Sequence, residues 1–149
     1  MQKTLLKISL ATMIASSALL AAPKWIDPPR KNCTSNGGKL AGGGICEANW
    51  DDATVICASL GAKLPTIEQL GKEVENCGGV VGDRDNNKND PAYQSCHKNK
   101  GFNPDGVYWS STARASDTSY ARYVNFYYGN GDWYDKIGDF YVRCVRAGQ

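Results

Sequence analysis

Alternating hydrophobic and polar positions near the C-terminus predict a β-hairpin. Residues 120–128 are rich in aromatic and β-branched side chains, which favour strands. Val124 and Phe126 fall on one face of this strand, because side chains alternate with period two. Gly129, Asn130 and Gly131 tolerate positive φ angles, so a turn is predicted at residues 129–131. A returning strand is predicted over residues 132–137.

A further strand is predicted over residues 140–145, after a turn at Gly138. The alternation puts Phe140, Val142 and Cys144 on the same face of this strand. A cysteine on the core face of the final strand needs a partner elsewhere in the chain.

The hydrophobic spacing over residues 49–60 predicts a helix. Asn49 is suited to the N-cap, and Gly61 to the position after the C-terminus. One face of this helix carries Trp50, Ala53, Cys57 and Leu60. Cys57 therefore points into the core and is the natural partner for Cys144.

A second helix is predicted from Pro65 to about Asn76. Thr66 and Gln69 have the spacing of a capping box, and the apolar stripe consists of Ile67, Leu70 and Val74. Residues 78–106 are rich in Gly, Asn, Asp and Lys and lack a hydrophobic period. They are predicted to form a long irregular segment, which in a compact domain is usually functional or held by a disulfide.

The N-terminal residues have the pattern of a secretory signal peptide. A short basic region precedes an apolar run over residues 8–20 that is too short to span a bilayer. Residues 1–22 are predicted to be the signal peptide, and the mature chain to begin between about Leu19 and Pro23. The following residues, 22–31, contain three prolines and are expected to form an extended leader.

The charge and cysteine content restrict the class of protein. Removal of the two lysines of the signal peptide leaves fifteen basic and fifteen acidic residues, so the mature chain has no formal net charge. This balance argues against nucleic acid or an anionic membrane as the main partner. The six cysteines all follow the signal peptide and include no CxxC pair. An exported chain with this pattern is expected to be disulfide-bonded.

Six cysteines allow fifteen pairings, and the sequence alone does not choose among them. A bridge between Cys33 and Cys46 would close a glycine-rich hairpin or loop. A bridge between Cys77 and Cys96 would hold the polar segment.

Several of these residues carry a family resemblance. The pattern Trp50-x-x-Ala53-x-x-x-Cys57-x-x-x-Gly61-Ala62-x-Leu64 resembles the first helix of C-type lectin domains. The segments LPT at 64–66, YWSST at 108–112 and YVRCVR at 141–146 resemble a bacterial branch more closely. That branch is the exported domain at the C-terminus of the Legionella collagen-like adhesin.

The resemblance implies an α+β protein of C-type-lectin-like fold, with two helices packed on antiparallel strands and a long loop region. It implies a disulfide between the first helix and the last strand, which matches Cys57–Cys144. We expect Cys33–Cys46 and Cys77–Cys96 as the other bridges. The expected organisation is a signal peptide at 1–22, a leader with an N-terminal disulfide hairpin at 23–46, and the lectin-like domain at 47–149.

The sequence departs from the motifs by which calcium-dependent lectins bind sugars. It contains neither Glu-Pro-Asn nor Gln-Pro-Asp, and Trp133-Tyr134-Asp135 only partly resembles the Trp-Asn-Asp motif of the family. Alternating oxygen-bearing side chains in the polar segment could surround a calcium ion, namely Asp83, Asp85, Asn87 and Asn89. The EF-hand glycine and glutamate are missing from this segment, so a solvated polar loop without a cofactor is the main expectation.

Catalysis is not expected. His97 is the only histidine, and a site combining it with Ser110 or Ser111 would rest on residues common in turns. The even cysteine count leaves no spare thiol for a reactive site.

Exposed aromatic residues are the better functional lead. Tyr123 and Tyr127 should point away from the core, and Tyr128, Trp133 and Tyr134 lie near the predicted turn, followed by Asp135. We expect residues 83–90 to form one exposed binding surface with the rings of Tyr127, Tyr128, Trp133 and Tyr134. Tyrosine and tryptophan suit such a surface because they provide rigid contact area with a polar end.

The sequence therefore predicts a secreted or periplasmic binding module whose mature form does not span a membrane. Its predicted ligand is a glycan or a cell-surface protein. The alternative is a structural subunit of an envelope or appendage assembly.

Overall fold

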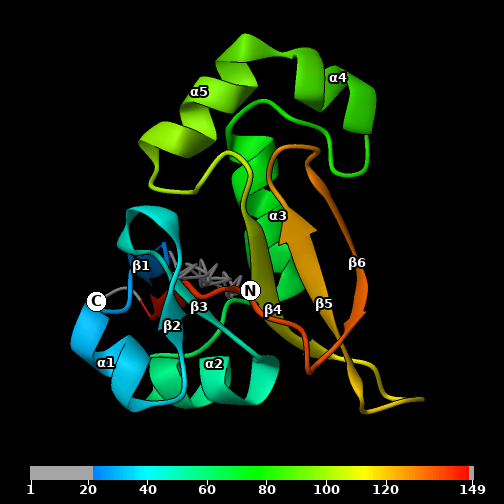
Figure 1. Ribbon diagram of the computed structural model, residues 1–149. Coiled ribbons are helices and arrows are strands. Elements are labelled where there is room, and N and C mark those ends of the chain that lie inside the picture. Colours follow the sequence, from blue (N-terminus) through cyan, green and yellow to red (C-terminus); the bar gives the residue numbers. More distant parts are fainter. Residues whose placement is uncertain (1–21, 148–149) are drawn as a thin grey trace, which may run out of the picture.

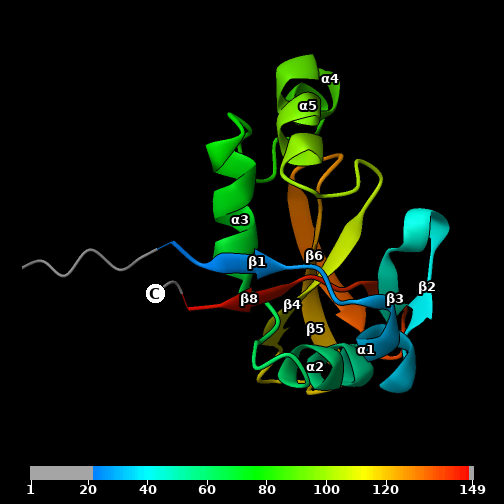
Figure 2. The same ribbon diagram turned by 90° about the vertical axis from the view of Figure 1, so that its left-hand side faces the viewer.

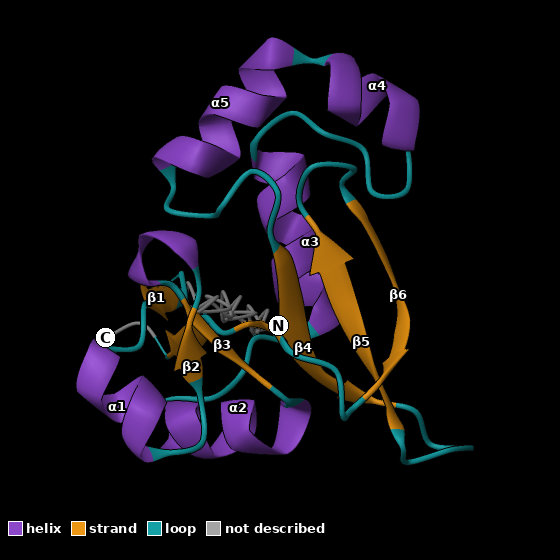
Figure 3. Cartoon of the chain, in the orientation of Figure 1, coloured by secondary structure: helices purple, strands orange, loops and turns teal. Residues whose placement is uncertain are grey.

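The computed structural model describes residues 22–147 as a mixed α+β fold (Figures 1 and 3). The helices of this range are α1 (Arg30–Ser35), the 3-10 turn η1 (Gly42–Gly44), α2 (Trp50–Ala58), α3 (Ile67–Asn76), α4 (Arg84–Asn89) and α5 (Pro91–Asn99). The strands are β1 (Lys24–Ile26), β2 (Lys39–Leu40), β3 (Cys46–Ala48), β4 (Val107–Ala113), β5 (Tyr120–Asn125), β6 (Asn130–Asp135), β7 (Phe140–Tyr141) and β8 (Cys144–Arg146). The predicted fold class is confirmed.

Six of these strands form one sheet in the order β2-β3-β7-β4-β5-β6. Its pairings are antiparallel except between β4 and β7, which run parallel. The hairpin of β5 and β6 is regular, and β6 is an edge strand. Figure 2 shows α3 on one side of this hairpin and β2 with β3 on the other.

The first core cluster lies around α2, whose predicted apolar face is confirmed. Ala53 and Cys57 are fully buried, and Trp50 and Leu60 pack against the cluster while half-buried. The Asn49 side chain accepts a hydrogen bond from the amide of Asp52, so Asn49 is the N-cap as predicted. Gly61 follows the helix with a φ angle of 62°, a conformation that glycine adopts without strain.

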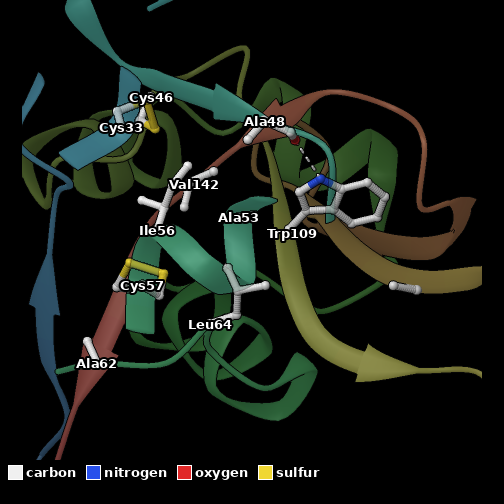
Figure 4. Packing of buried hydrophobic residues seen from close by; sticks show 12 residues of the cluster. Cys33, Cys46, Ala48, Ala53, Ile56, Cys57, Ala62, Leu64, Trp109 and Val142 are labelled. Atoms are coloured by element: carbon white, nitrogen blue, oxygen red, sulfur yellow. Dashed lines mark hydrogen bonds between the residues drawn. A yellow bond between two sulfur atoms is a disulfide. The ribbon is translucent and has the colours of Figure 1, made fainter. Parts of the chain in front are cut away.

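Trp109 connects β4 to this cluster. Its ring is fully buried, and its indole N–H donates to the carbonyl oxygen of Ala48 at 3.0 Å (Figure 4). Phe140 packs against the indole with 4.5 Å between ring centroids. A buried indole is tolerated because its one polar group has this partner.

The second core cluster lies between α3 and the other side of the sheet. Leu70 and Val74 of α3 pack with Tyr108, Val124 and Phe126, all of them buried. The capping box is confirmed: the Thr66 hydroxyl accepts from the amide of Gln69, whose side chain accepts from the amide of Thr66. This box fixes the start of α3 at Ile67, two residues after the predicted start at Pro65.

The residues predicted as an extended leader, 22–31, contain β1 and the start of α1. β1 pairs antiparallel with β8 in a second, two-stranded sheet, so the two ends of the described chain lie side by side (Figure 2). The guanidinium of Arg143 pairs with Asp27 and donates to the carbonyl of Lys100. Residues 33–46 are not a simple hairpin, because they contain the end of α1, β2 and η1.

The polar segment at 78–106 is not irregular, and this prediction is wrong. It folds into α4 and α5, which lie across the upper end of the β4–β6 strands (Figure 1). The side chain of Asp90 caps α5 by accepting from the amides of Ala92 and Tyr93, and Pro91 occupies the first turn. The segment buries few side chains, and this explains why a hydrophobic period is missing. The α4–α5 segment is called the cap below.

Two boundaries in the C-terminal strands also differ from the prediction. The hairpin turn lies at 126–129 rather than 129–131, and Gly129 supplies its positive φ of 61°. The final strand is broken into β7 and β8, which belong to different sheets, although Phe140, Val142 and Cys144 still pack into the first core cluster.

The expected disulfides are present as Cys33–Cys46, Cys57–Cys144 and Cys77–Cys96. The described range contains no free cysteine. Figure 4 shows the Cys33–Cys46 bridge and the bridge made by Cys57 within the first cluster. The predicted signal peptide lies almost entirely outside the described residues.

Candidate functional site

The β5–β6 hairpin presents two faces with different chemistry. Tyr123 and Tyr134 belong to one side, here called the tyrosine face. Val124, Arg122 and Trp133 belong to the opposite side, here called the α3 face, because Val124 packs with the buried residues of α3. Side chains alternate along each strand, so neighbouring residues cannot share a face.

The tyrosine face carries a continuous row of aromatic rings. The centroids of Tyr123 and Tyr134 are 6.3 Å apart, and those of Tyr134 and Phe140 are 5.0 Å apart. The Tyr134 side chain is 48% exposed, whereas Tyr123 and Phe140 are half-buried and pack against the first core cluster. Tyr134 is therefore the ring that an external ligand can reach over the largest area.

The cap adds a positive charge to the upper end of this hairpin. The guanidinium of Arg84 on α4 lies 4.5 Å from the ring centroid of Tyr128 in the turn. The Tyr127 and Tyr128 rings meet edge to face, with 4.9 Å between centroids. The predicted proximity of residues 83–90 to Tyr127 and Tyr128 is thus observed in the fold.

Amide side chains hold the cap against the turn. The Asn87 side chain donates to the carbonyls of Val80 and Tyr128, at 2.7 and 3.0 Å, and accepts from the amide of Val80 at 2.9 Å. Gln94 of α5 donates to the carbonyl of Tyr127 at 2.9 Å. Because these groups are part-buried, the hydrogen bonds fix the position of Arg84 relative to the rings.

Charged groups alter the chemistry of the half-buried ring. Burial raises the pKa of the Tyr123 hydroxyl, and the nearby Asp132 carboxylate raises this pKa further. Arg84 opposes the effect and lowers the same pKa. The Tyr123 hydroxyl therefore stays protonated at neutral pH and can donate a hydrogen bond to a ligand.

An acidic hollow adjoins the ring row at Phe140. A hollow of about 190 Å³ adjoins Phe140 and is lined by the carboxylates of Glu47, Asp105 and Asp139. Asp139 pairs with Lys39 at 2.8 Å on the surface. The face thus offers apolar ring area with Arg84 and Asp132 near Tyr123 and an acidic hollow beside Phe140.

Trp133 does not belong to this face, so the prediction of one common surface is corrected. Its indole lies on the α3 face, with the guanidinium groups of Arg114 and Arg122 at 4.7 and 5.5 Å from the ring centroid. Asp135 pairs with Tyr120 across the strands, and its carboxylate accepts from the amide of Ile137. The reason is the strand period: Trp133 and Tyr134 are adjacent and must point in opposite directions.

The four candidate calcium ligands, the lesser expectation from the sequence, do not converge on one point. Asp83 precedes α4, and Asp85, Asn87 and Asn89 lie on the helix itself, where residues two apart point to different sides. The Asn87 oxygen is already bonded to the amide of Val80. Within residues 22–147, no group of three or more His, Cys, Asp or Glu side chains could hold a metal ion.

The candidate catalytic residues are engaged elsewhere. His97 is a fully buried residue of α5 and hydrogen-bonds Gln94, with 3.0 Å between Nε2 and Oε1. The Ser110 hydroxyl is buried and donates to the carbonyl of Arg122 at 2.8 Å. Histidine and serine are therefore not paired as a nucleophile and its base.

Sequence reasoning missed Arg114, Arg122 and Asp132 as site residues, and it included Arg84 only as part of the range 83–90. The alternation of β5 could have grouped Arg122 with Val124, but nothing in the local sequence places Arg84 beside Tyr128. That contact depends on how the cap folds over the turn.

Comparison with protein families gives one match over most of the chain. The model described as the Lcl C-terminal domain matches residues 24–146. A comparison with curated proteins found no match. In the range 22–147, the helices are all too short or too polar to cross a membrane.

Proposed function

The chain belongs to the Lcl C-terminal domain family, and from this premise we propose that it is an exported, non-catalytic binding module. Its ligand in this proposal is a glycan or a protein at the cell surface or in the envelope. The match covers residues 24–146, which is almost the whole described range of 22–147.

The observation that carries the proposal is the ring row on the tyrosine face. Tyr134 is 48% exposed although it packs on Phe140 and Tyr123, so its position is set by contacts that need no ligand. A preorganised aromatic side chain loses little conformational entropy on binding, which makes it an effective contact residue.

The polar groups at the ends of the row would orient the ligand. Arg84 provides a cation at the upper end, and Asp132 lies beside Tyr123. Sugar rings and protein side chains can both stack on a tyrosine while hydrogen-bonding to such neighbours. Tyr127 and Tyr128 extend the contact area toward the cap.

Substitution of the exposed rings tests this function. We expect Tyr134→Ala or Tyr128→Ala to weaken ligand binding by at least about 1 kcal/mol, as truncation of an interface anchor does. A glycan array followed by titration of the hits measures the effect, with Val55→Ala as a control because this exposed residue lies on α2. If Tyr134→Ala lowers the melting temperature sharply but leaves the affinity unchanged, Tyr134 is structural and the site lies elsewhere.

The alternative role is a structural subunit of an envelope or appendage assembly. Stable co-purification with one envelope protein, together with a blank glycan array, would favour this role. In that outcome Tyr134→Ala is expected to reduce assembly rather than ligand affinity.

A further inference from the structure

A groove runs along the α3 face beside the hairpin. It has a cavity volume of about 370 Å³, and its lining includes Ile67, Glu68, Gly71, Glu75, Val81 and Arg122. Val81 lies in the segment between α3 and the cap and is 50% exposed. The groove is therefore bounded by a helix on one side, an apolar side chain at one end and an arginine of β5.

Arg122 is a cation without an acidic partner among the described residues. Within residues 22–147 neither Arg122 nor Arg114 forms an ion pair. The Nε atom of Arg122 is buried and has no hydrogen-bond partner in that range. Both guanidinium groups lie against Trp133, so this end of the groove combines positive charge with an aromatic ring. The terminal nitrogens of a guanidinium carry further N–H donors, and without an ion pair they are free to take a ligand carboxylate.

The floor of the groove is a glycine in the middle of α3. Gly71 is unfavourable there by helix propensity, because glycine destabilises a helix interior relative to alanine. An added Cβ would contact only the Val81 side chain, at 3.6 Å, so packing does not require glycine at this position. The missing side chain keeps the groove open and allows another chain to approach the helix closely.

The remaining charges of the groove restrict its ligand. Two carboxylates, Glu68 and Glu75, and two cations, Lys72 and Arg122, line the cavity, and Lys72 pairs with Glu75. Glu68 has no ion pair among residues 22–147, so a polymer with a negative charge on every unit would be repelled there, whereas a single carboxylate can pair with Arg122 alone. A peptide can instead present one carboxylate at Arg122 and apolar side chains toward Ile67 and Val81.

We propose that the groove between α3 and β5 is a second binding site, which takes a peptide segment of a protein partner with one acidic residue beside aliphatic or aromatic residues. The site is independent of the tyrosine face, because it lies on the opposite side of the hairpin. The carboxylate of the peptide pairs with Arg122, next to Trp133 and Arg114. The apolar side chains lie over Gly71.

An array of blocked synthetic peptides tests the proposal on the mature protein. Each peptide carries one Asp or Glu next to two apolar residues. The set covers every pair of apolar residues drawn from Val, Ile, Leu and Phe. We expect some of them to bind with dissociation constants below about 1 mM, and to shift the amide NMR signals of Ile67, Gly71 and Val81. Peptides with Asn or Gln in place of the acid should bind at least about fivefold more weakly.

Two variants separate binding from folding. Arg122→Gln and Gly71→Ala should each weaken peptide binding at least about fivefold, while Gly71→Ala leaves the melting temperature unchanged or raised. Tyr134→Ala should leave peptide binding unchanged, since it alters only the tyrosine face. The proposed glycan or protein recognition by that face can therefore fail without affecting this result.

Three outcomes would overturn the second site. These are an array without binding peptides, peptide binding that survives both groove variants, and NMR shifts confined to the tyrosine face. Heparin is the counter-probe: if heparin binds and Gly71→Ala abolishes its binding, the groove takes an anionic glycan instead of a peptide.

Discussion

His97 is buried in an apolar part of the cap. Its ring lies 5.0 Å from the Tyr93 ring and 5.8 Å from the Phe126 ring, between centroids. Its Nδ1 atom is buried without a hydrogen-bond partner among the described residues. Burial lowers the pKa of His97 below its ordinary value of 6.5, because the imidazolium loses hydration there.

This burial makes the protein less stable in mild acid. Because the folded pKa is lowered, the unfolded chain binds the proton more tightly than the folded protein does. The contribution of neutral His97 to stability is therefore fully present above pH 6.5 and is lost as the pH falls toward the folded pKa. The free energy of unfolding should fall by at most about 1.4 kcal/mol per pH unit in this window. Urea unfolding at pH 7.5 and 5 measures it. His97→Gln should flatten the dependence, and an equal slope in that variant would contradict the assignment to His97.

The buried amide of Asn87 is one of the groups that hold the cap to the hairpin, beside the buried ring of Tyr93 and the hydrogen bond from Gln94. Asn87 is 3% exposed, and its side chain satisfies backbone groups of Val80 and Tyr128. Each backbone group would be left without a partner if the amide were removed, and a buried unsatisfied group costs about 1–3 kcal/mol. Asn87 therefore contributes to the position of α4 through three hydrogen bonds to backbone groups.

Asn87→Ala should therefore destabilise the protein by about 2 kcal/mol and loosen the cap before the rest of the fold. Hydrogen exchange over residues 80–97 should become faster, while exchange in β4 and β5 changes little. Asn89→Ala is the matched control, because Asn89 lies on the same helix and is exposed, so its effect should stay within about 0.5 kcal/mol. Equal effects of the two substitutions would show that the amide contacts contribute little.

The whole molecule is closed by a covalent connection between its first long helix and its last strand. Cys57 and Cys144 are separated by 87 positions and are both fully buried. Cys77 and Cys96 are separated by 19 positions and connect α3 to the cap. The entropy of the unfolded chain falls more when a longer loop is closed.

Removal of the long-range bridge should therefore cost more than removal of the cap bridge. Replacement of Cys57 and Cys144 by alanine should lower the free energy of unfolding by about 4–5 kcal/mol, against about 3 kcal/mol for Cys77 and Cys96. Guanidinium unfolding measures both, and non-reducing peptide mapping checks the pairings. The reverse order of losses, or a Cys57–Cys77 peptide, would contradict this description of the fold.

Local signals in the sequence were sufficient for α2, α3 and the hairpin strands. The Asn49 cap, the Thr66–Gln69 capping box and the alternation around Val124 each involve residues within a few positions of one another. Such signals act through neighbouring backbone groups, so they hold whatever the rest of the chain does. The turn was misplaced by a few residues because Asn130 and Gly131 pair within β6 instead of turning.

The sequence by itself determined the fold class, the family and the apolar faces of α2 and α3, whereas the cysteine pairing followed only with the help of the family resemblance. Only the tertiary structure decided that the polar segment folds into a cap, that Arg84 lies over Tyr128, and that Trp133 and Tyr134 serve opposite faces. The physical reason is the range of the interactions. Helix-capping residues and hydrophobic periods are local, whereas the α4–α5 cap is held by buried amides, a disulfide and contacts with a turn more than thirty positions away.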